Sequence, residues 1–441
     1  MAVGISCRWL EAAAEQDLDP TALLPWACDW TPVGVISSRP MEASVYDIPP
    51  GIRRAMDYGK LAGPAPRMLV LRSRYWLDDA CIRAAQTLDW PVRTVPVTQE
   101  GVLPQENIAQ LLQSIVEFRP DFILTVNLGG IDEEGSLARL FDELHLPYVV
   151  WFADDPRTIM MDRSIYASPY AAAFTWDSAY CGYLAACGFP VARTLPLAAD
   201  PALFNSGPAS SWQHPPTFVG NSMTAAARAE WGWVNQRPHL AAAVSEALDS
   251  GRVTREQFAQ GLTALLDPPF VASLDAHERR HAEILLFSEG THRLRCEFVR
   301  ALEPEGIDVR GDNEWVEFFP RVGGPINYEH DLTGFYRACE VNLNITSIQM
   351  ATAANQRVFD CPAAGGFLLT DAQHSLASLF DPDQLAVFHS FNECRDLLRW
   401  YRAKPRARTE MVTKARLRIL DQHTYAHRLR HIEDTLRQYL K

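Results

Sequence analysis

The chain has 441 residues, of which 47% are hydrophobic and 22% are charged, and its formal net charge is −13. This length favours two domains, because domains of about 100–200 residues are the norm. The acidic balance argues against a general nucleic-acid or anionic-membrane surface, which needs a basic face, but it leaves room for one small basic pocket. No apolar run approaches the roughly 20 residues of a membrane helix.

Residues 1–63 mix short helical patterns with proline-rich breaks, and we interpret them as a leader packed on the first domain. Strands and helices then alternate through a first domain, residues 64–205. The predicted strands are 67–73, 92–97, 121–127, 147–153, 172–177 and 192–198, and the predicted helices are 77–90, 106–120 and 133–146. This alternation predicts parallel pairing with right-handed crossovers, a doubly wound sheet.

A segment rich in Pro, Ser and Gly, residues 199–216, is predicted to be the interdomain linker. A second domain, residues 217–405, begins with the strand "TFVGN" and carries a helical insertion at about 224–303. Strands and helices alternate again after the insertion, and residues 406–441 are typical of amphipathic C-terminal helices. The expected fold is therefore α/β, with two Rossmann-like doubly wound domains facing a central cleft, where such folds bind ligands.

Polar residues interrupt an otherwise apolar helix in "NQRVFDCPAAGGFLLTD", residues 355–371. Asn355 lies in the first turn, and Arg357 and Asp360 share one face. Asn344 ends the preceding strand, before a hydroxyl-rich loop. Free N–H groups at the helix start, together with the guanidinium, suit a diphosphate, and the carboxylate suits ribose hydroxyls. An exposed ion pair between Arg357 and Asp360 is the alternative.

The start of the second domain, "FVGNSMTAAAR", offers a further phosphate contact. Gly220 and Asn221 form a turn after the first strand, where the backbone can approach a phosphate. Arg228 could reach the same charge, or it could lie in solvent.

Two loops follow strands of the first domain and are predicted to face the cleft. Gly129 and Gly130 permit close approach of a ligand, although a tight turn also explains them. Asp154 and Asp155 are adjacent, so at most one of them is expected to face a substrate as general base. A helix N-cap, or an ion pair with Arg157, is the alternative. Two carboxylates without further ligands make a poor metal site.

The 355–371 segment resembles the nucleotide-sugar signature of GT-B glycosyltransferases. More narrowly, it is similar to the group named after the spore maturation protein CgeB, whose run N-x-R-x-F-[ED] and Gly-rich end are matched by Asn355, Arg357, Phe359, Asp360, Gly365 and Gly366. Further matches, in order, are "WFADDPR" (151–157), "FTWD" (174–177), "LPLAADPALF" (195–204), "FVGN" (218–221) and "HTYAHR" (423–428). The resemblance runs from about residue 67 to the end.

The resemblance implies transfer of a sugar from a nucleoside diphosphate sugar to a hydroxyl of a carbohydrate or protein, with no obligatory metal or other cofactor. It assigns Gly365 and Gly366 to the nucleotide-sugar site and suggests surface polysaccharide or protein glycosylation in bacteria. Asp360 stands where Glu is commoner, and Thr352 stands where broader GT-B enzymes often carry another Glu. A nucleotide-sugar epimerase, a phosphorylase or a non-catalytic nucleotide-sugar-binding protein are the rival hypotheses.

The location expected from the sequence is the cytoplasm. The nine cysteines lack CxxC spacing, and no signal peptide is evident, so free thiols in a reducing compartment are favoured. We expect no nucleic-acid partner and no integral membrane segment, and no oligomeric state is assigned.

Overall fold

A computed structural model describes residue 48 and residues 50–97, 105–161, 163, 165–209 and 211–440. The backbone alone is described for residues 105–109. The chain divides into two compact units. The first comprises residues 1–176, 181–195 and 428–441, and the second comprises residues 177–180 and 196–427. Most of the leader predicted for residues 1–63 lies outside the described residues.

The first unit is built on a six-stranded sheet in the order β2-β1-β3-β4-β5-β6, with every neighbouring pair parallel. The strands are β1 (Met68–Arg72), β2 (Val92–Pro96), β3 (Phe122–Val126), β4 (Tyr148–Phe152), β5 (Ala171–Thr175) and β6 (Val191–Thr194). The helices are α2 (Pro50–Met56), α3 (Trp76–Thr87), α4 (Gln105–Phe118), α5 (Ser136–Glu143), α6 (Pro156–Met160), α7 (Cys181–Ala186) and the later turns of α19 (Tyr425–Tyr439). Every residue of β3, β4 and β5 is buried, as expected for central strands with both faces covered.

The second unit holds another parallel six-stranded sheet, in the order β12-β11-β10-β7-β8-β9. Its strands are β7 (Thr217–Val219), β8 (Asp308–Arg310), β9 (Val322–Gly323), β10 (Asn342–Asn344), β11 (Leu368–Asp371) and β12 (Ala386–Phe388). The helices that follow the insertion are α14 (Leu332–Ala338), α15 (Arg357–Ala363), α16 (Leu376–Leu379), α17 (Phe391–Arg402) and α18 (Pro405–Gln422), and short 3-10 turns lie at Ser178–Tyr180, Glu303–Glu305 and Asn313–Glu317.

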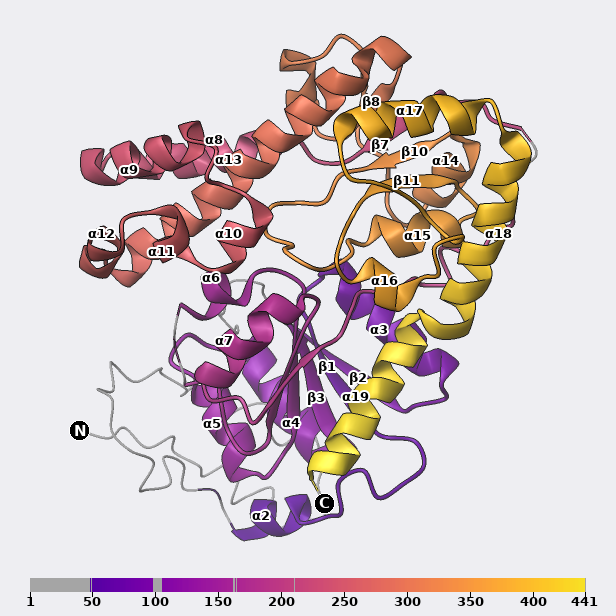
Figure 1. The fold of residues 1–441 in the computed structure, drawn as a ribbon. Coiled ribbons are helices and arrows are strands. Elements are labelled where there is room, and N and C mark those ends of the chain that lie inside the picture. The colour runs from indigo at the N-terminus through magenta and orange to yellow at the C-terminus, as the bar shows by residue number, and fades with distance from the viewer. Residues whose placement is uncertain are drawn as a thin grey trace. The chain divides into compact units, whose positions relative to one another are not determined.

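Between β7 and β8 the chain forms a helical insertion around the long helix α13 (Ala276–Leu302) (Figure 1). The insertion contains α8 (Thr224–Val234), α9 (Pro238–Asp249), α10 (Arg255–Ala259), α11 (Leu262–Leu265) and α12 (Pro268–Ser273). Asp275 caps α13, because its Oδ1 accepts from the Glu278 amide at 2.8 Å. In return, Glu278 Oε2 accepts from the Asp275 amide at 3.2 Å. The insertion therefore begins its main helix with a reciprocal capping box.

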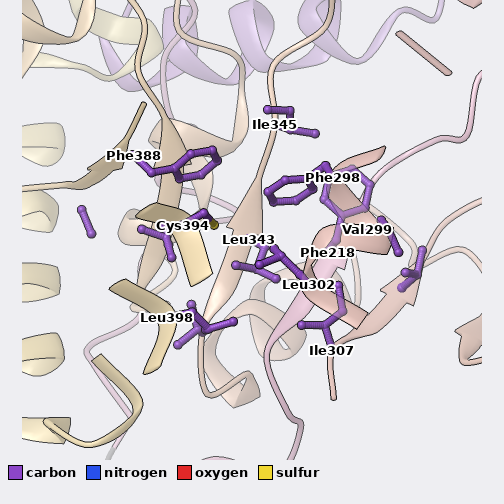
Figure 2. Packing of buried hydrophobic residues seen from close by; sticks show 14 of the residues in the cluster. Phe218, Phe298, Val299, Leu302, Ile307, Leu343, Ile345, Phe388, Cys394 and Leu398 are labelled. Atoms are coloured by element: carbon purple, nitrogen blue, oxygen red, sulfur yellow. The ribbon is translucent and has the colours of Figure 1, made fainter. Parts of the chain in front are cut away.

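The second unit has two hydrophobic cores, which α13 joins. The C-terminal half of α13 packs on the sheet, where Phe298, Val299 and Leu302 lie in one cluster with Phe218 and Leu343 (Figure 2). Its N-terminal half packs among α8–α12 in a separate cluster. The insertion is thus a packed helical body held by one continuous helix to the sheet.

The prediction of an α/β fold with two Rossmann-like parallel sheets is confirmed. The ends of individual strands differ from the predicted ones by up to four residues: most strands are shorter than predicted, and β5 and β6 also begin one residue earlier. Among the described residues, no helix combines the length and apolarity needed to cross a membrane.

Asp78 holds the loop between β1 and α3 in place through hydrogen bonds. It is fully buried, and its Oδ2 accepts from the Ser73 amide at 2.8 Å, the Ser73 hydroxyl at 2.9 Å and the Tyr75 amide at 3.1 Å. Burial raises the pKa of Asp78 to about 6, and the hydrogen bonds oppose the rise only in part. The neutral form of Asp78 therefore persists to a higher pH in the folded protein than in the unfolded chain.

We expect Asp78 to make the wild type lose stability as the pH rises. Between the ordinary aspartate pKa of about 3.9 and the folded value, the folded state binds more protons than the unfolded state, so this contribution falls with rising pH. Urea unfolding of wild type and Asp78→Asn at pH 4.5 and pH 7 measures the effect. The free energy of unfolding of the wild type, relative to that of Asp78→Asn, should be larger at pH 4.5 than at pH 7. An equal difference at the two pH values would contradict a raised pKa of Asp78.

Candidate functional site

Three strands of the second sheet end close together at its carboxyl edge: β7 at Val219, β10 at Asn344 and β11 at Asp371. Asn344 lies beside Thr370 in the parallel register. In open α/β sheets this edge is where ligands bind. The helix α15 starts here, because it connects the end of β10 to the beginning of β11.

Asn344 orients Arg357 at this edge. The buried Asn344 amide donates to Thr370 Oγ1 at 2.9 Å and to Asn355 Oδ1 at 3.1 Å. Its Oδ1 accepts from Asn355 Nδ2 and from Arg357 Nη1, both at 2.8 Å. Three residues predicted from the sequence, Asn344, Asn355 and Arg357, thus form one hydrogen-bonded group.

Gly220 makes room for the Arg357 guanidinium. A Cβ atom at position 220 would lie 2.8 Å from Arg357 Nη2 and 2.8 Å from Phe218 Cζ. The guanidinium carbon is 5.6 Å from the centre of the Phe218 ring. A side chain at position 220 would therefore displace the guanidinium. The glycine is explained by its closeness to Arg357, without the predicted approach of a phosphate to this turn.

Arg295, on α13, was not predicted from the sequence, and it belongs to the same group. Only 7% of it is exposed, its Nη1 donates to the Asn221 carbonyl at 2.6 Å, and its buried Nε has no hydrogen-bond partner. Burial and, next, the charge of Arg357 lower the pKa of Arg295 to about 9, against the opposing charges of Asp312 and Asp371. Two guanidinium groups that repel each other in a buried place would be stabilised by an anion.

Arg255 joins the helical insertion to the sheet edge. Its Nη2 lies 2.6 Å from Asp371 Oδ2 and donates to the Thr346 carbonyl at 2.5 Å. Asp371 Oδ1 also accepts from the Thr346 amide at 3.1 Å and from the Thr346 hydroxyl at 2.9 Å. These contacts fix the loop after β10, and with Arg295 and Arg357 they bring three arginines to one edge.

Asp360 is buried rather than open to ligand. It is 1% exposed, and its two oxygens accept from the Tyr328 hydroxyl at 2.8 Å and from Gln356 Nε2 at 2.7 Å. Burial raises the pKa of Asp360 well above its ordinary range, and the charge of Asp200 adds to the rise. Arg357 and Asp360 thus have different partners, and a ribose hydroxyl would have to displace Tyr328 or Gln356 to reach the carboxylate.

Gly365 and Gly366 lie at the opposite edge of the sheet, because they follow α15 and precede β11. A Cβ atom on Gly365 would lie 2.3 Å from the Gly207 carbonyl oxygen, and one on Gly366 would lie 2.7 Å from the Tyr336 carbonyl oxygen. Close backbone packing is therefore sufficient to account for both glycines without the predicted contact with a nucleotide sugar.

We expect Gly365→Ala to reduce stability without changing ligand affinity. Gly365 has φ +85°, which a residue with a Cβ adopts only with strain, and the neighbouring backbone leaves no space. The free energy of unfolding should fall by about 1–3 kcal/mol. Denaturant unfolding measures this loss. Nucleotide titration below the transition is the second measurement, and a selective loss of nucleotide affinity would restore a binding role.

Two other candidates in the second unit have structural partners. Arg228 forms a surface pair with Glu317, with Nη1–Oε1 and Nη2–Oε2 distances of 2.9 and 2.5 Å. Asn221 Oδ1 accepts from the Met223 amide at 2.7 Å. Arg228 is therefore held away from the Arg295–Arg357 group by an exposed partner, whereas the Asn221 carbonyl contacts Arg295 directly.

Asp154 stands at the carboxyl edge of the first sheet, directly after β4. Its Oδ2 accepts from the Tyr75 hydroxyl at 3.0 Å and from Asn127 Nδ2 at 2.8 Å. Asn127 Oδ1 in turn accepts from the amides of Ala153 at 2.8 Å and Asp154 at 3.2 Å. Residues after β1, β3 and β4 thus hold this carboxylate in a fixed position.

Asp155 has the structural role that was the alternative interpretation. It is 1% exposed, caps α6 by accepting from the Arg157 amide at 2.9 Å, and pairs with Arg157 Nη2 at 2.6 Å. Of the two adjacent carboxylates, only Asp154 keeps a position suited to a substrate. The helix cap and the ion pair are therefore sufficient to account for Asp155 without the predicted catalytic role.

Gly129 and Gly130 are also explained by packing within the first unit. A Cβ atom on Gly129 would lie 2.9 Å from Ser73 Cβ, and one on Gly130, whose φ is +79°, would lie 2.7 Å from Val97 Cγ1. The tight turn is thus sufficient to account for both glycines. Within the part of the chain that the structure describes, no group of three His, Cys, Asp or Glu side chains could hold a metal ion.

Residues 292–434 match the family model described as glycosyl transferase-like. This segment contains Arg295, Asn344, Arg357 and most of the second sheet. No curated protein matches the chain. The prediction of a glycosyltransferase of the GT-B kind is confirmed at that level, by this match together with the two parallel sheets.

Solved structures with similar folds have low sequence identity. Sucrose-phosphate synthase from Thermosynechococcus elongatus has 11% identity and a TM-score of 0.46, over 85% of this chain and 99% of that one. Anabaena HepE in complex with UDP has 10% identity and a TM-score of 0.46, over 85% and 100%. An α1,3-fucosyltransferase has 10% identity and a TM-score of 0.41, over 88% and 94%.

Proposed function

We propose that the chain transfers a sugar from a nucleoside diphosphate sugar to a hydroxyl group of an acceptor. One observation carries this proposal: Arg295 and Arg357 converge on the carboxyl edge of the second sheet, and the buried Arg295 keeps an unpartnered Nε there. A doubly charged diphosphate would relieve the repulsion between the two cations and supply the missing acceptor.

The same two arginines would assist departure of the diphosphate. When the bond between the anomeric carbon and the diphosphate oxygen breaks, negative charge grows on the diphosphate and oxocarbenium character grows on the sugar. Guanidinium groups already oriented by Asn344 and by the Asn221 carbonyl need little rearrangement to stabilise that charge. No metal ion is required for this step.

Asp154 is our proposed general base. The acceptor hydroxyl would give its proton to the carboxylate while its oxygen bonds to the anomeric carbon, and the diphosphate would leave with the bonding electrons. The hydrogen bonds from Tyr75 and Asn127 fix the orientation of Asp154. Gly129 and Gly130 would contribute the shape of the adjacent loop.

We further propose that the chain belongs to the CgeB-like group. The run from Asn355 to Asp360 and the "HTYAHR" segment (423–428) support this assignment. These two motifs are joined in the second unit, because the Tyr425 hydroxyl donates to Gln356 Oε1 at 3.0 Å and Gln356 donates to Asp360. The acceptor would then be a bacterial surface polysaccharide or protein, and the reaction would be cytoplasmic.

A thermal-shift screen against UDP, GDP and their sugar conjugates tests the proposal first. A ligand that binds only the folded protein raises the melting temperature by mass action, so one nucleotide class should stand out. The protein is then incubated with the stabilising donor and candidate acceptors. A new glycoside supports transfer; an isomer, a sugar phosphate or binding without turnover would each replace the proposal with a rival function.

A further inference from the structure

A cavity of about 620 Å³ opens at the amino edge of the first sheet, within the part of the chain that the structure describes. Its walls include Arg54 of α2, Lys60, His145 and Tyr170. Pro147, which also lines it, directly precedes β4, whereas Asp154 follows the other end of that strand. At about 3.3 Å per residue, the cavity lies roughly 23 Å from Asp154, so it is separate from the proposed catalytic group.

Three cations lie over the ring of Tyr58, and of these Lys60 lines the cavity, as Tyr58 does. Lys60 Nζ lies 3.9 Å from the ring centre, and the guanidinium carbons of Arg119 and Arg67 lie 4.6 and 4.9 Å from it. Asp121 neutralises Arg67 through a 3.2 Å contact. The cavity itself is lined by three cationic side chains, Arg53, Arg54 and Lys60, and by two carboxylates, Asp57 and Glu143. Its wall therefore keeps a net positive charge of one in a protein whose net charge is −13.

Arg54 adds a free cation to the wall of the cavity. It is exposed, and within the described ranges no hydrogen bond or ion pair engages its guanidinium. The neighbouring Arg53 instead contacts Glu143 at 3.4 Å. Arg54 is therefore available to a carboxylate or phosphate entering the cavity.

A flat aromatic pair forms another part of the wall. The rings of His145 and Tyr170 are stacked, with centres 5.0 Å apart and planes inclined by 19°. His145 is exposed and Tyr170 is half-buried. A stacked pair of this kind offers a rigid, flat surface with a polar rim, which suits the C–H face of a pyranose ring.

We propose that this cavity binds a saccharide segment that carries a carboxylate or a phosphate, with the sugar ring on the His145–Tyr170 pair and the acidic group at Arg54 and Lys60. A volume of 620 Å³ is within the range of small-ligand sites. The site goes beyond sugar transfer, because it would hold an acidic glycan far from the reacting atoms. Such holding raises the effective concentration of a long acceptor at the enzyme.

Isothermal titration of the full-length protein tests the proposal with four probes: trigalacturonic acid, glucose 6-phosphate, maltotriose and inorganic phosphate. We expect saturable binding of at least one acidic saccharide and none of maltotriose. The first two probes distinguish a carboxylate from a phosphate as the recognised group. Absence of saturable binding by both, or inorganic phosphate binding as tightly as the saccharides, would overturn the proposal.

Variants test whether the acidic saccharide binds in this cavity. Arg54→Ala and Tyr170→Ala should each weaken the bound acidic saccharide about tenfold, whereas Arg93→Ala should not, because Arg93 is an exposed arginine of the same unit that pairs with Glu117. Unchanged affinity in both cavity variants would overturn the assignment. The nucleotide-induced thermal shift should stay at its wild-type value in all three, which separates failure of this site from failure of the proposed transferase function.

Discussion

Replacing Arg357 by alanine is expected to reduce kcat/KM for the donor about 100- to 1,000-fold and to weaken the free nucleoside diphosphate about tenfold or more. The variant loses a charge-assisted contact to the diphosphate, and the contribution of such groups is largest when charge develops in the transition state. It also leaves Asn344 Oδ1 with one donor fewer. Steady-state kinetics with the donor found in the screen, and titration with the nucleotide, measure the two effects.

Three further variants test the reason for this loss. Arg357→Lys keeps the charge but not the planar fork, so it should recover only part of the affinity. Arg295→Met should resemble Arg357→Ala, because the two guanidiniums would share the ligand. Arg300→Ala changes an exposed arginine on the same helix as Arg295 and should behave like the wild type. Wild-type nucleotide affinity in Arg357→Ala would remove the diphosphate site from this edge.

Asp154→Asn is expected to lower kcat about 100- to 10,000-fold, the usual range for loss of a general base, while the KM for the donor stays nearly unchanged. The amide has almost the same shape as the carboxylate and can still accept from Tyr75 or Asn127 through its oxygen. Kinetics at saturating acceptor, together with nucleotide titration, separate the loss of chemistry from a loss of binding.

Asp155→Asn is the matched comparison, because it changes the adjacent carboxylate. The loss of the Arg157 ion pair, which is almost fully buried, should lower the free energy of unfolding by a few kcal/mol and leave kcat of the folded enzyme close to normal. If Asp154→Asn transfers sugar at the wild-type rate, another group must accept the proton.

The regular alternation of apolar strands and helices was enough to predict both sheets, since parallel pairing follows from it. The group of Asn344, Asn355 and Arg357 could also be predicted from the sequence, because polar side chains at the end of a strand and at the start of the next helix lie at the same edge of the sheet. The packing role of the two-glycine motif was not accessible from the sequence. Its conformation is visible in the sequence, but the backbone that packs against Gly365 comes from Gly207, about 160 residues earlier.

Arg295 shows why part of the site was missed. In the 27-residue helix α13, Thr291, Arg295, Phe298 and Leu302 are all buried and follow one helical stripe. A cation within an apolar stripe was the available signal, but six Arg residues occur between positions 279 and 310, and the other five hid it. Likewise, the sequence left open which of Asp154 and Asp155 has a structural role, and the contact of Asp155 with Arg157 became visible only in the structure.

The first unit is completed by residues 428–440, which follow the whole second unit in the sequence. Leu429, Ile432 and Leu436 of α19 are buried in it, and Arg437 donates to the Gly63 carbonyl at 2.6 Å. During synthesis, the ribosome must therefore complete the entire second unit before the first can acquire its final helix. The part of the first unit that is made first must wait, incompletely covered, for more than 200 residues to be translated, and proteolytic cleavage within α19 would damage that part.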